Sequence, residues 1–322
     1  MQSTINFSNI VLPFLVSFAI TAAIGHILIP ALRKLKATQT ERDDGPASHL
    51  KKTGTPNMGG IMFILGFVIT CTIFSFRNRE VIPVMFLTVG FGLVGFIDDY
   101  IKNVLHRSLG LRAWQKMALQ IVIVLLFSFY IDHFYHIPLS MKVPFTGVMV
   151  DFGILNVPIM VFIMVATVNG TNLTDGVDGL LSCVTVPVAI FFLIAALLQG
   201  SGSFASSAAM LGGLLGFLLY NAYPAKVFMG DTGSLAIGGF VAGTAYMLQM
   251  PLFIPLVGII YLIESLSVII QVSYFKATHG KRFFKMAPIH HHYEKLGYSE
   301  VQVVAGFTIT TVILAALCLV GI

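Results

Sequence analysis

The residues that could do chemistry lie in four polar stretches, the first of which holds two adjacent carboxylates. Asp98 and Asp99 end a long apolar run, and Lys102 follows one helical turn later. Neighbouring carboxylates repel each other and are costly beside a bilayer, so they need cations nearby. The other stretches are 169–180, with two Asp-Gly steps among Asn and Thr residues, 221–234, with a Gly-Asp-Thr-Gly turn, and 279–294, which is basic and rich in histidine.

Together these stretches supply the groups that phosphoryl chemistry needs. Mg²⁺ is a hard cation that usually takes one or two carboxylates and fills its other positions with phosphate oxygens and water. Asp231 and the aspartate pair are suitable ligands or bases. Lys and His side chains can neutralise a diphosphate, and a glycine at a helix N-terminus lets a phosphate approach closely. The pattern therefore indicates a metal-assisted site for a polyanion.

Each motif has a plainer interpretation when it is taken alone. Asp98 and Asp99 could be a solvated helix end paired with Lys102, the Asp-Gly steps could be ordinary turns, and Asp231 could cap a helix. The run His290–His292 suggests zinc, but consecutive helical side chains diverge by about 100° and rarely bind one ion. The common side and order of the motifs are therefore more informative than any single one.

The elements that must position these residues are membrane helices. The chain has 322 residues, 57% hydrophobic and 10% charged, with a mean hydropathy of +0.89. Soluble domains have about 25% charged residues, so we expect an all-α polytopic membrane protein, with one integral membrane domain over 1–322. Ten apolar segments are candidate transmembrane helices: 10–32, 57–76, 81–101, 116–135, 155–171, 179–198, 205–223, 233–249, 252–275 and 301–321.

Two segments have features of their own. The apolar segment 252–275 contains Pro255, which cannot donate a main-chain hydrogen bond, so we expect this helix to be bent or broken. It also contains Glu264, which is either functional or paired with a polar neighbour, and the sequence does not choose between these. The stretch 137–156 alternates around a Thr-Gly turn and predicts a short extracytoplasmic β-hairpin.

The positive charges predict the orientation. Of the 19 Lys and Arg residues, all but Arg77, Arg79 and Lys142 fall in loops that follow odd-numbered segments. Positively charged loops stay in the cytoplasm, so these loops are predicted to be cytoplasmic and both termini to lie outside. The four polar stretches fall on the same side. The net charge of +5 therefore reflects membrane orientation and does not indicate a nucleic-acid partner.

Five motifs resemble those of one enzyme family: GTPNMGG at 54–60, GFIDDYIK at 95–102, NLTDGVDGL at 172–180, FMGDTGS at 228–234 and PIHHHYE at 288–294. They look like the phospho-N-acetylmuramoyl-pentapeptide transferases, a branch of the polyprenyl-phosphate N-acetylhexosamine-1-phosphate transferase superfamily. The resemblance runs from about residue 33 to 294, and the expected ten helices agree with the family. The triple-histidine motif favours the muramoyl-pentapeptide branch.

The resemblance implies transfer of phospho-MurNAc-pentapeptide from its UDP carrier to undecaprenyl phosphate, on the cytoplasmic face of a bacterial plasma membrane. The products would be lipid I, for peptidoglycan synthesis, and UMP. By the family's pattern, Asp231 would bind Mg²⁺, Asp98 and Asp99 would activate the lipid phosphate, and His290 would join them in catalysis. The substrate-binding residues would be Lys51, Lys102, Lys116, Asn172, Asp175, Gly176, Asp178, Asn221, Phe228, His290 and His291.

The two adjacent aspartates are expected to differ in role, because helical neighbours point about 100° apart. Asp98 would be the base toward the lipid phosphate, and Asp99 would order the cation and Lys102. The nearest alternative is a sister enzyme that transfers GlcNAc-1-phosphate to the same lipid. An ion-coupled transporter is a further alternative, suggested by Glu264 in a broken helix, and a structural scaffold is the weakest. The oligomeric state is not fixed by the sequence, and a homodimer is one candidate.

Overall fold

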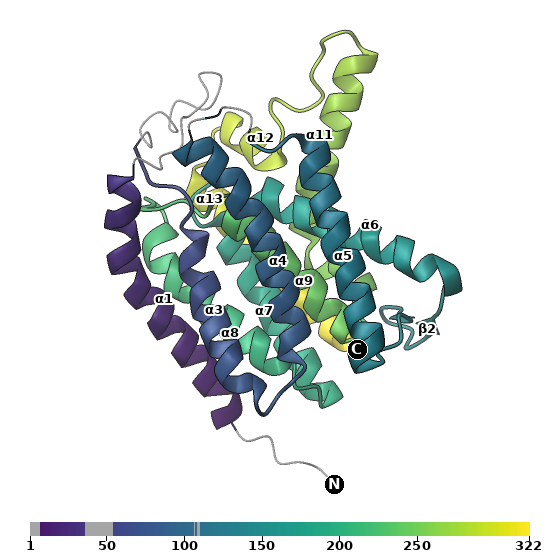
Figure 1. The fold of residues 1–322 in the computed structure, drawn as a ribbon. Coiled ribbons are helices and arrows are strands. Elements are labelled where there is room, and N and C mark those ends of the chain that lie inside the picture. Colours follow the sequence, from purple (N-terminus) through teal and green to yellow (C-terminus); the bar gives the residue numbers. More distant parts are fainter. Residues whose placement is uncertain (1–6, 36–53, 106, 108–109) are drawn as a thin grey trace.

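The computed structural model describes residues 7–35, 54–105, 107 and 110–322, most of which lie in packed helices (Figure 1). Eight candidate membrane spans occur in this part of the chain, each long and apolar enough to cross a bilayer. They are built on α1 (Ser8–Lys34), α4 (Val81–Asp99), α5 (Ala113–Tyr135), α6 (Asn156–Thr174), α7 (Leu180–Gln199), α8 (Phe204–Asn221), α11 (Ile259–Ala277) and α13 (Glu300–Val320). The chain is therefore a polytopic helical membrane protein.

The two other predicted segments also form helices, α3 (Gly60–Ser75) and α9 (Gly230–Met247). α3 is apolar but has only 16 residues. α9 is buried from Thr232 to Met247, which places it inside the bundle. A helix enclosed by other helices needs no lipid-facing surface, so small and polar residues are tolerated along it. All ten predicted segments are thus helical, while ten membrane crossings stay a prediction.

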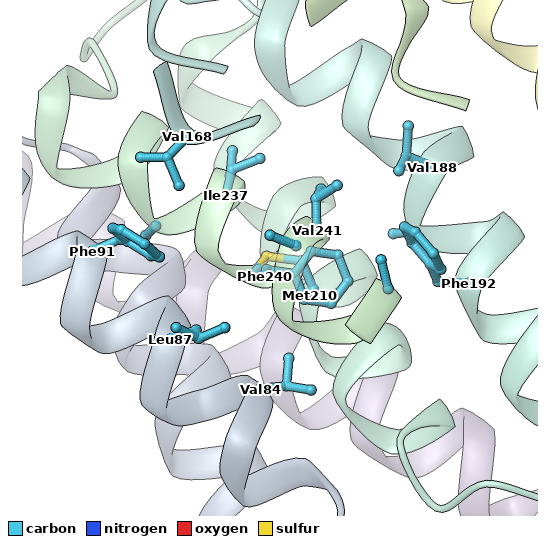
Figure 2. Packing of buried hydrophobic residues seen from close by; sticks show 14 of the residues in the cluster. Val84, Leu87, Phe91, Val168, Val188, Phe192, Met210, Ile237, Phe240 and Val241 are labelled. Carbon is cyan, nitrogen blue, oxygen red and sulfur yellow. The ribbon is translucent and has the colours of Figure 1, made fainter. Parts of the chain in front are cut away.

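The core forms where α4 and α6 pack against α9. Figure 2 shows Leu87 and Phe91 of α4 among the buried side chains around Phe240 of α9. A Cβ on Gly239 would lie 2.6 Å from the main-chain oxygen of Leu87, so glycine at this position lets the two helices approach closely. Close packing of this kind drives helix association in lipid. It fixes the register of α4 and α9, the two helices that carry Asp98, Asp99 and Asp231.

The predicted break in segment 252–275 is confirmed. The chain forms a 3-10 turn, η3 (Pro251–Phe253), and the short helix α10 (Ile254–Val257) before Gly258 separates α10 from α11. Pro255 lies in the first turn of α10, where its missing N–H removes no helical hydrogen bond, and the interruption itself falls at Gly258, whose backbone is not helical. The C-terminal half of α11 extends away from the other helices (Figure 1). Glu264 lies in the half that stays packed, where it is buried.

Short elements complete the two ends of the bundle. Strands β1 (Met141–Lys142) and β2 (Met149–Val150) pair antiparallel, and the N–H of Phe145 between them bonds to Gly321 at the end of α13. A 3-10 turn, η2 (Gly153–Leu155), then leads into α6. In Figure 1 the start of α1 and the end of α13 lie toward one end, and α12 (Ile289–Lys295) lies toward the other. A π-helical turn, η1 (Tyr100–Val104), continues α4.

Candidate active site

Asp231 is held by three side chains from three other elements. It stands in the first turn of α9. Its Oδ2 accepts hydrogen bonds from the Nζ atoms of Lys102 in η1, at 3.2 Å, and Lys116 in α5, at 2.9 Å. Its Oδ1 accepts one from the Nδ2 of Asn172 in α6, at 2.8 Å. The α9 N-terminus is thus the point where charged groups from distant parts of the sequence converge.

Asp98 shares both lysines with Asp231. Its Oδ2 lies 2.6 Å from the Nζ of Lys102 and 3.7 Å from the Nζ of Lys116, while its Oδ1 accepts the N–H of Leu111 at 2.6 Å. The Asp98 side chain is only 2% exposed. A solvated helix end is therefore the wrong interpretation of this residue, because its charge is balanced inside the protein. The two carboxylates and two ammonium groups form one network, called here the aspartate–lysine cluster.

Asp99 points to a different partner from the one that the sequence predicts. Its Oδ2 accepts two hydrogen bonds from Thr232, from the N–H at 2.8 Å and from the hydroxyl at 2.7 Å. Lys102 pairs with Asp98 instead, so the prediction that Asp99 orders Lys102 is wrong. The reason is helical geometry: residues four apart share a face, whereas Asp99 is turned by about 100° toward α9. Asp99 therefore joins α4 to the start of α9.

A glycine makes this convergence of α4 and α9 possible. A Cβ on Gly95 would overlap the main-chain oxygen of Asp231. Any other residue would push the start of α9 away from the end of α4, and both carboxylates would lose their common lysines. The exposed fraction is 20% for the Asp231 side chain and 38% for Lys102, against 2% for Asp98. Asp231 and Lys102 are therefore the most exposed members of the cluster, and Lys116 is 16% exposed.

Two loops beside the cluster carry further predicted residues. Loop 175–179 joins α6 to α7, and loop 222–229 joins α8 to α9. The Oδ2 of Asp178 accepts the N–H of Ala225 at 2.8 Å, which ties one loop to the other. The Nδ2 of Asn221 donates to the main-chain oxygen of Val227 at 3.0 Å, which closes the second loop. Both predicted residues therefore shape the loops through main-chain contacts.

Asp175 and Phe228 lie in these same two loops. Burial, together with the nearby carboxylates Asp231 and Asp99, raises the pKa of Asp175 to about 8. The main chain of Phe228 bonds to segment 56–59: its N–H donates to Pro56, and its oxygen accepts from Gly59. The GTPNMGG and FMGDTGS motifs are thus neighbours in the folded chain.

The predicted histidines, His290 and His291, lie at the start of α12, and each contacts a carboxylate. His290 is 1% exposed, and its Nδ1 lies 3.0 Å from the Oε1 of Glu264 in α11. A Cβ on Gly176 would overlap the His290 ring, so loop 175–179 packs directly on the imidazole. The Nδ1 of His291 lies 2.7 Å from the Oε2 of Glu294, within the same helix. The two histidines therefore face different carboxylates.

The structure brings several of the predicted site residues into direct contact. Asp98, Lys102, Lys116, Asn172 and Asp231 are joined by direct contacts, and His290 contacts Gly176 rather than this cluster. The predicted Lys51 lies outside the described residues.

Three polar residues take part that the sequence did not assign to the site. Thr232 binds Asp99, the Ser234 hydroxyl accepts from Asn172 at 2.9 Å, and Glu264 binds His290. Thr232 and Ser234 lie within the FMGDTGS motif, which is the signal that could have found them. Glu264 carried a signal too, because it is an acid inside an apolar segment.

This fold and cluster define a polytopic membrane protein with a charged site where its helices end. Comparisons with known proteins identify its family. A family model described as glycosyl transferase family 4 matches residues 81–249. Phospho-N-acetylmuramoyl-pentapeptide-transferases from Acetivibrio thermocellus, Clostridioides difficile and Clostridium botulinum are 47%, 48% and 49% identical to it. The matches cover 98%, 96% and 95% of this chain, and 95%, 96% and 94% of the relatives.

The chain therefore belongs to the phospho-N-acetylmuramoyl-pentapeptide-transferase family. The resemblance seen in the five motifs is thereby confirmed.

Proposed function

We propose that this chain transfers phospho-MurNAc-pentapeptide from UDP-MurNAc-pentapeptide to undecaprenyl phosphate, which yields lipid I and UMP for peptidoglycan synthesis. The observation that carries the proposal is the sharing of Lys102 and Lys116 between Asp98 and Asp231. Two ammonium groups beside a partly exposed carboxylate can bind a diphosphate, while a second carboxylate can accept a proton. These are the parts that transfer between two phosphate-bearing substrates requires.

The reaction would proceed by direct attack. An oxygen of the lipid phosphate forms a bond to the β-phosphorus of the UDP-sugar, and the bond from that phosphorus to the α–β bridging oxygen breaks. UMP leaves with the bonding electrons. Asp98 would accept the proton that the lipid phosphate carries, and Lys102 and Lys116 would balance the charge on the phosphoryl oxygens. Positioning and charge neutralisation supply most of the catalysis in phosphoryl transfer.

The donor set is suited to Mg²⁺, with Asp231 as its protein ligand. Among the described residues, no group of three or more His, Cys, Asp or Glu side chains is arranged to hold a metal. Mg²⁺ does not need such a group, because one or two carboxylates and substrate phosphates suffice. Asp231 meets that condition, since it is the partly exposed carboxylate of the cluster. When bound, Mg²⁺ would neutralise charge on the diphosphate.

The remaining predicted residues would bind the rest of the nucleotide sugar. Asn172, which bonds to Asp231, connects the cluster with loop 175–179. That loop and loop 222–229 are tied together through Asp178, which supports a nucleoside site between them, with Phe228 as a flanking aromatic. The further members of this proposed substrate-binding set are Lys51, Asp175, Gly176, Asn221, His290 and His291.

The proposed setting is a bacterial plasma membrane with the site on the cytoplasmic face. Ten crossings with both termini outside would place the β1–β2 pair on the outer side. The distribution of Lys and Arg supports this orientation, since all but three of the 19 lie in loops on one side. A nucleotide sugar is a cytoplasmic metabolite, and a lipid phosphate lies at the membrane boundary, so the cluster would meet both. A homodimer is compatible with this arrangement.

The test is UMP release by the purified chain in detergent or lipid. We expect UMP and lipid I from UDP-MurNAc-pentapeptide only when undecaprenyl phosphate and Mg²⁺ are both present. UDP-GlcNAc assayed in parallel separates the proposed reaction from that of the sister enzyme. A chain that releases UMP only from UDP-GlcNAc, or from neither sugar, would contradict the proposal.

A further inference from the structure

A buried pair of ionisable side chains lies apart from the aspartate–lysine cluster. The Oε1 of Glu264 and the Nδ1 of His290 are 3.0 Å apart, and the two side chains are 0% and 1% exposed. They come from different helices, α11 and α12. Burying such a pair contributes little net stability compared with apolar side chains of similar size. The pair therefore needs a reason other than stabilisation of the fold.

We propose that Glu264 is a positioning residue that orients the His290 imidazole toward loop 175–179 and the substrate beside it. This inference rests on the proposed function, in which His290 binds the diphosphate or the sugar. Glu264 itself would not touch the substrate.

The chemistry of the pair fixes the orientation of the ring. A carboxylate oxygen can only accept a hydrogen bond, so the contact with Glu264 keeps a proton on Nδ1 of His290. The other ring nitrogen, Nε2, has no hydrogen-bond partner among the described residues, although it is buried. A buried polar atom left without a partner is uncommon in folded proteins. Nε2 is therefore the ring atom whose hydrogen-bonding capacity the described residues leave unused.

The position of Gly176 shows which part of the protein the Nε2 edge of the ring faces. A Cβ on Gly176 would overlap the ring at Nε2, so the imidazole edge that faces away from Glu264 faces the loop. This loop lies next to Asn172, which bonds to Asp231. Glu264, His290 and Gly176 thus form a contiguous path from α11 to the nucleotide-sugar loop. The same arrangement, in which an acid orients a histidine for work at its far nitrogen, is a recurring device in active sites.

A double-mutant cycle tests this inference. Glu264→Gln keeps the size of the side chain, but an amide can either accept from Nδ1 or donate to it, so the ring loses its fixed tautomer. We expect kcat to fall roughly 10–100-fold, as for other groups that orient a catalytic or metal-binding histidine. His290→Ala should fall on the order of 10²-fold or more. The double variant should be no slower than His290→Ala, because Glu264 acts only through the histidine.

Ser267→Ala is the matched control. Ser267 is buried in the same helix, and its hydroxyl bonds only to the main-chain oxygen of Glu264 among the described residues, at 2.7 Å. Its loss should leave kcat nearly unchanged, because the hydroxyl bonds to a main-chain oxygen and to neither side chain of the Glu264–His290 pair. Losses that add in the double variant, or a Glu264→Gln enzyme with normal kcat, would overturn the inference.

A spectroscopic readout makes the inference independent of turnover and of how well Glu264→Gln folds. Protein with ¹⁵N-labelled histidine rings should show a protonated Nδ1 for His290, assigned by its disappearance in His290→Ala. In Glu264→Gln that signal should shift toward a mixture of tautomers. A wild-type His290 protonated only at Nε2 would overturn the inference. A wild-type chain that releases no UMP would instead contradict the proposed function, while the ring signals would still test the pair.

Discussion

Asp99 accepts two hydrogen bonds on one carboxylate oxygen, both from Thr232 at the start of α9. The neighbouring Asp98 instead faces Lys102 and Lys116. The two adjacent acids thus have different surroundings: Asp99 joins two helices, and Asp98 has two cationic partners. Asp99 holds the start of α9, where Asp231 stands, in place. Asp98 is linked to Asp231 through their shared lysines, Lys102 and Lys116.

Single substitutions of the two acids should lower both turnover and stability but spare nucleotide-sugar binding. Asp98→Asn and Asp99→Asn should each cut turnover severely and leave UDP-sugar affinity nearly unchanged. Each should also lower stability by about 1.5–3 kcal/mol, because both carboxylates are 2% exposed and each loses a buried charged hydrogen bond. UMP release, nucleotide-sugar affinity and the unfolding midpoint measure the three quantities. Substantial turnover in both variants would remove the pair from the mechanism.

Asp231 should be indispensable for turnover and dispensable for folding. Asp231→Asn keeps the shape of the side chain but removes the charge that Lys102, Lys116 and the proposed Mg²⁺ share. We expect UMP release to become undetectable while the detergent-solubilised protein keeps its elution profile and unfolding midpoint. The control is wild type titrated with Mg²⁺ after chelation. Near-normal activity with an unchanged Mg²⁺ dependence would exclude Asp231 as the ligand.

The sequence predicted which residues lie together better than the contacts among them. Residue types indicated that Asp98, Asp231 and Lys102 share one polar site, and the family resemblance added Asn172; the structure brings these four side chains together. The choice of Thr232 as the partner of Asp99 depends on the register between α4 and α9, and that register is set by close packing at Gly95. Tertiary packing of this kind leaves no periodic signal along the chain.

The Glu264–His290 pair could not be predicted from the sequence for a similar reason. The two residues lie 26 positions apart, with the rest of α11, a loop and the first residue of α12 between them. The sequence predicts the break before α11, but not the direction in which α12 returns. Glu264, an acid in an apolar segment, indicated that a polar partner exists, but only the fold shows that this partner is His290.

The histidines of α12 should act as substrate-binding groups and not as zinc ligands. His290→Ala or His291→Ala should each reduce kcat/KM on the order of 10²-fold or more, as expected when a preorganised donor is removed. Metal analysis of the purified active protein should show no stoichiometric zinc. Zinc at one equivalent, lost together with activity on chelation, would refute this assignment.

Asp175 should make stability depend on pH. Burial and its neighbouring carboxylates raise its pKa in the folded protein to about 8, whereas the unfolded chain ionises at its ordinary, lower pKa. Between those values the unfolded state binds fewer protons, so stability is highest below the ordinary pKa and falls as the pH rises toward 8. With a chelator present, Asp175→Asn should unfold several degrees above wild type at pH 9 and by a much smaller margin at pH 5.

The control for Asp175 is Asp151→Asn. Asp151 is exposed, and hydrogen bonds from Gly153 and Asn156 lower its pKa. Its titration lies below the tested range, so its substitution should change the unfolding midpoint equally at every pH from about 5 to 9. A midpoint difference for Asp175→Asn that does not change with pH would show that this carboxyl group ionises normally.

The orientation of the bundle can be tested at the loop after α11. Phe283 is 59% exposed in the basic segment 276–285, which the charge distribution assigns to the cytoplasm. In a chain whose three native cysteines are replaced, Phe283→Cys should resist an impermeant thiol reagent in intact cells and react after the cells are opened. Val148 lies in the turn between β1 and β2 and is 55% exposed. A cysteine in its place, Val148→Cys, should react in intact cells. The opposite pattern at these two positions would invert the topology and move the proposed site away from its cytoplasmic substrate.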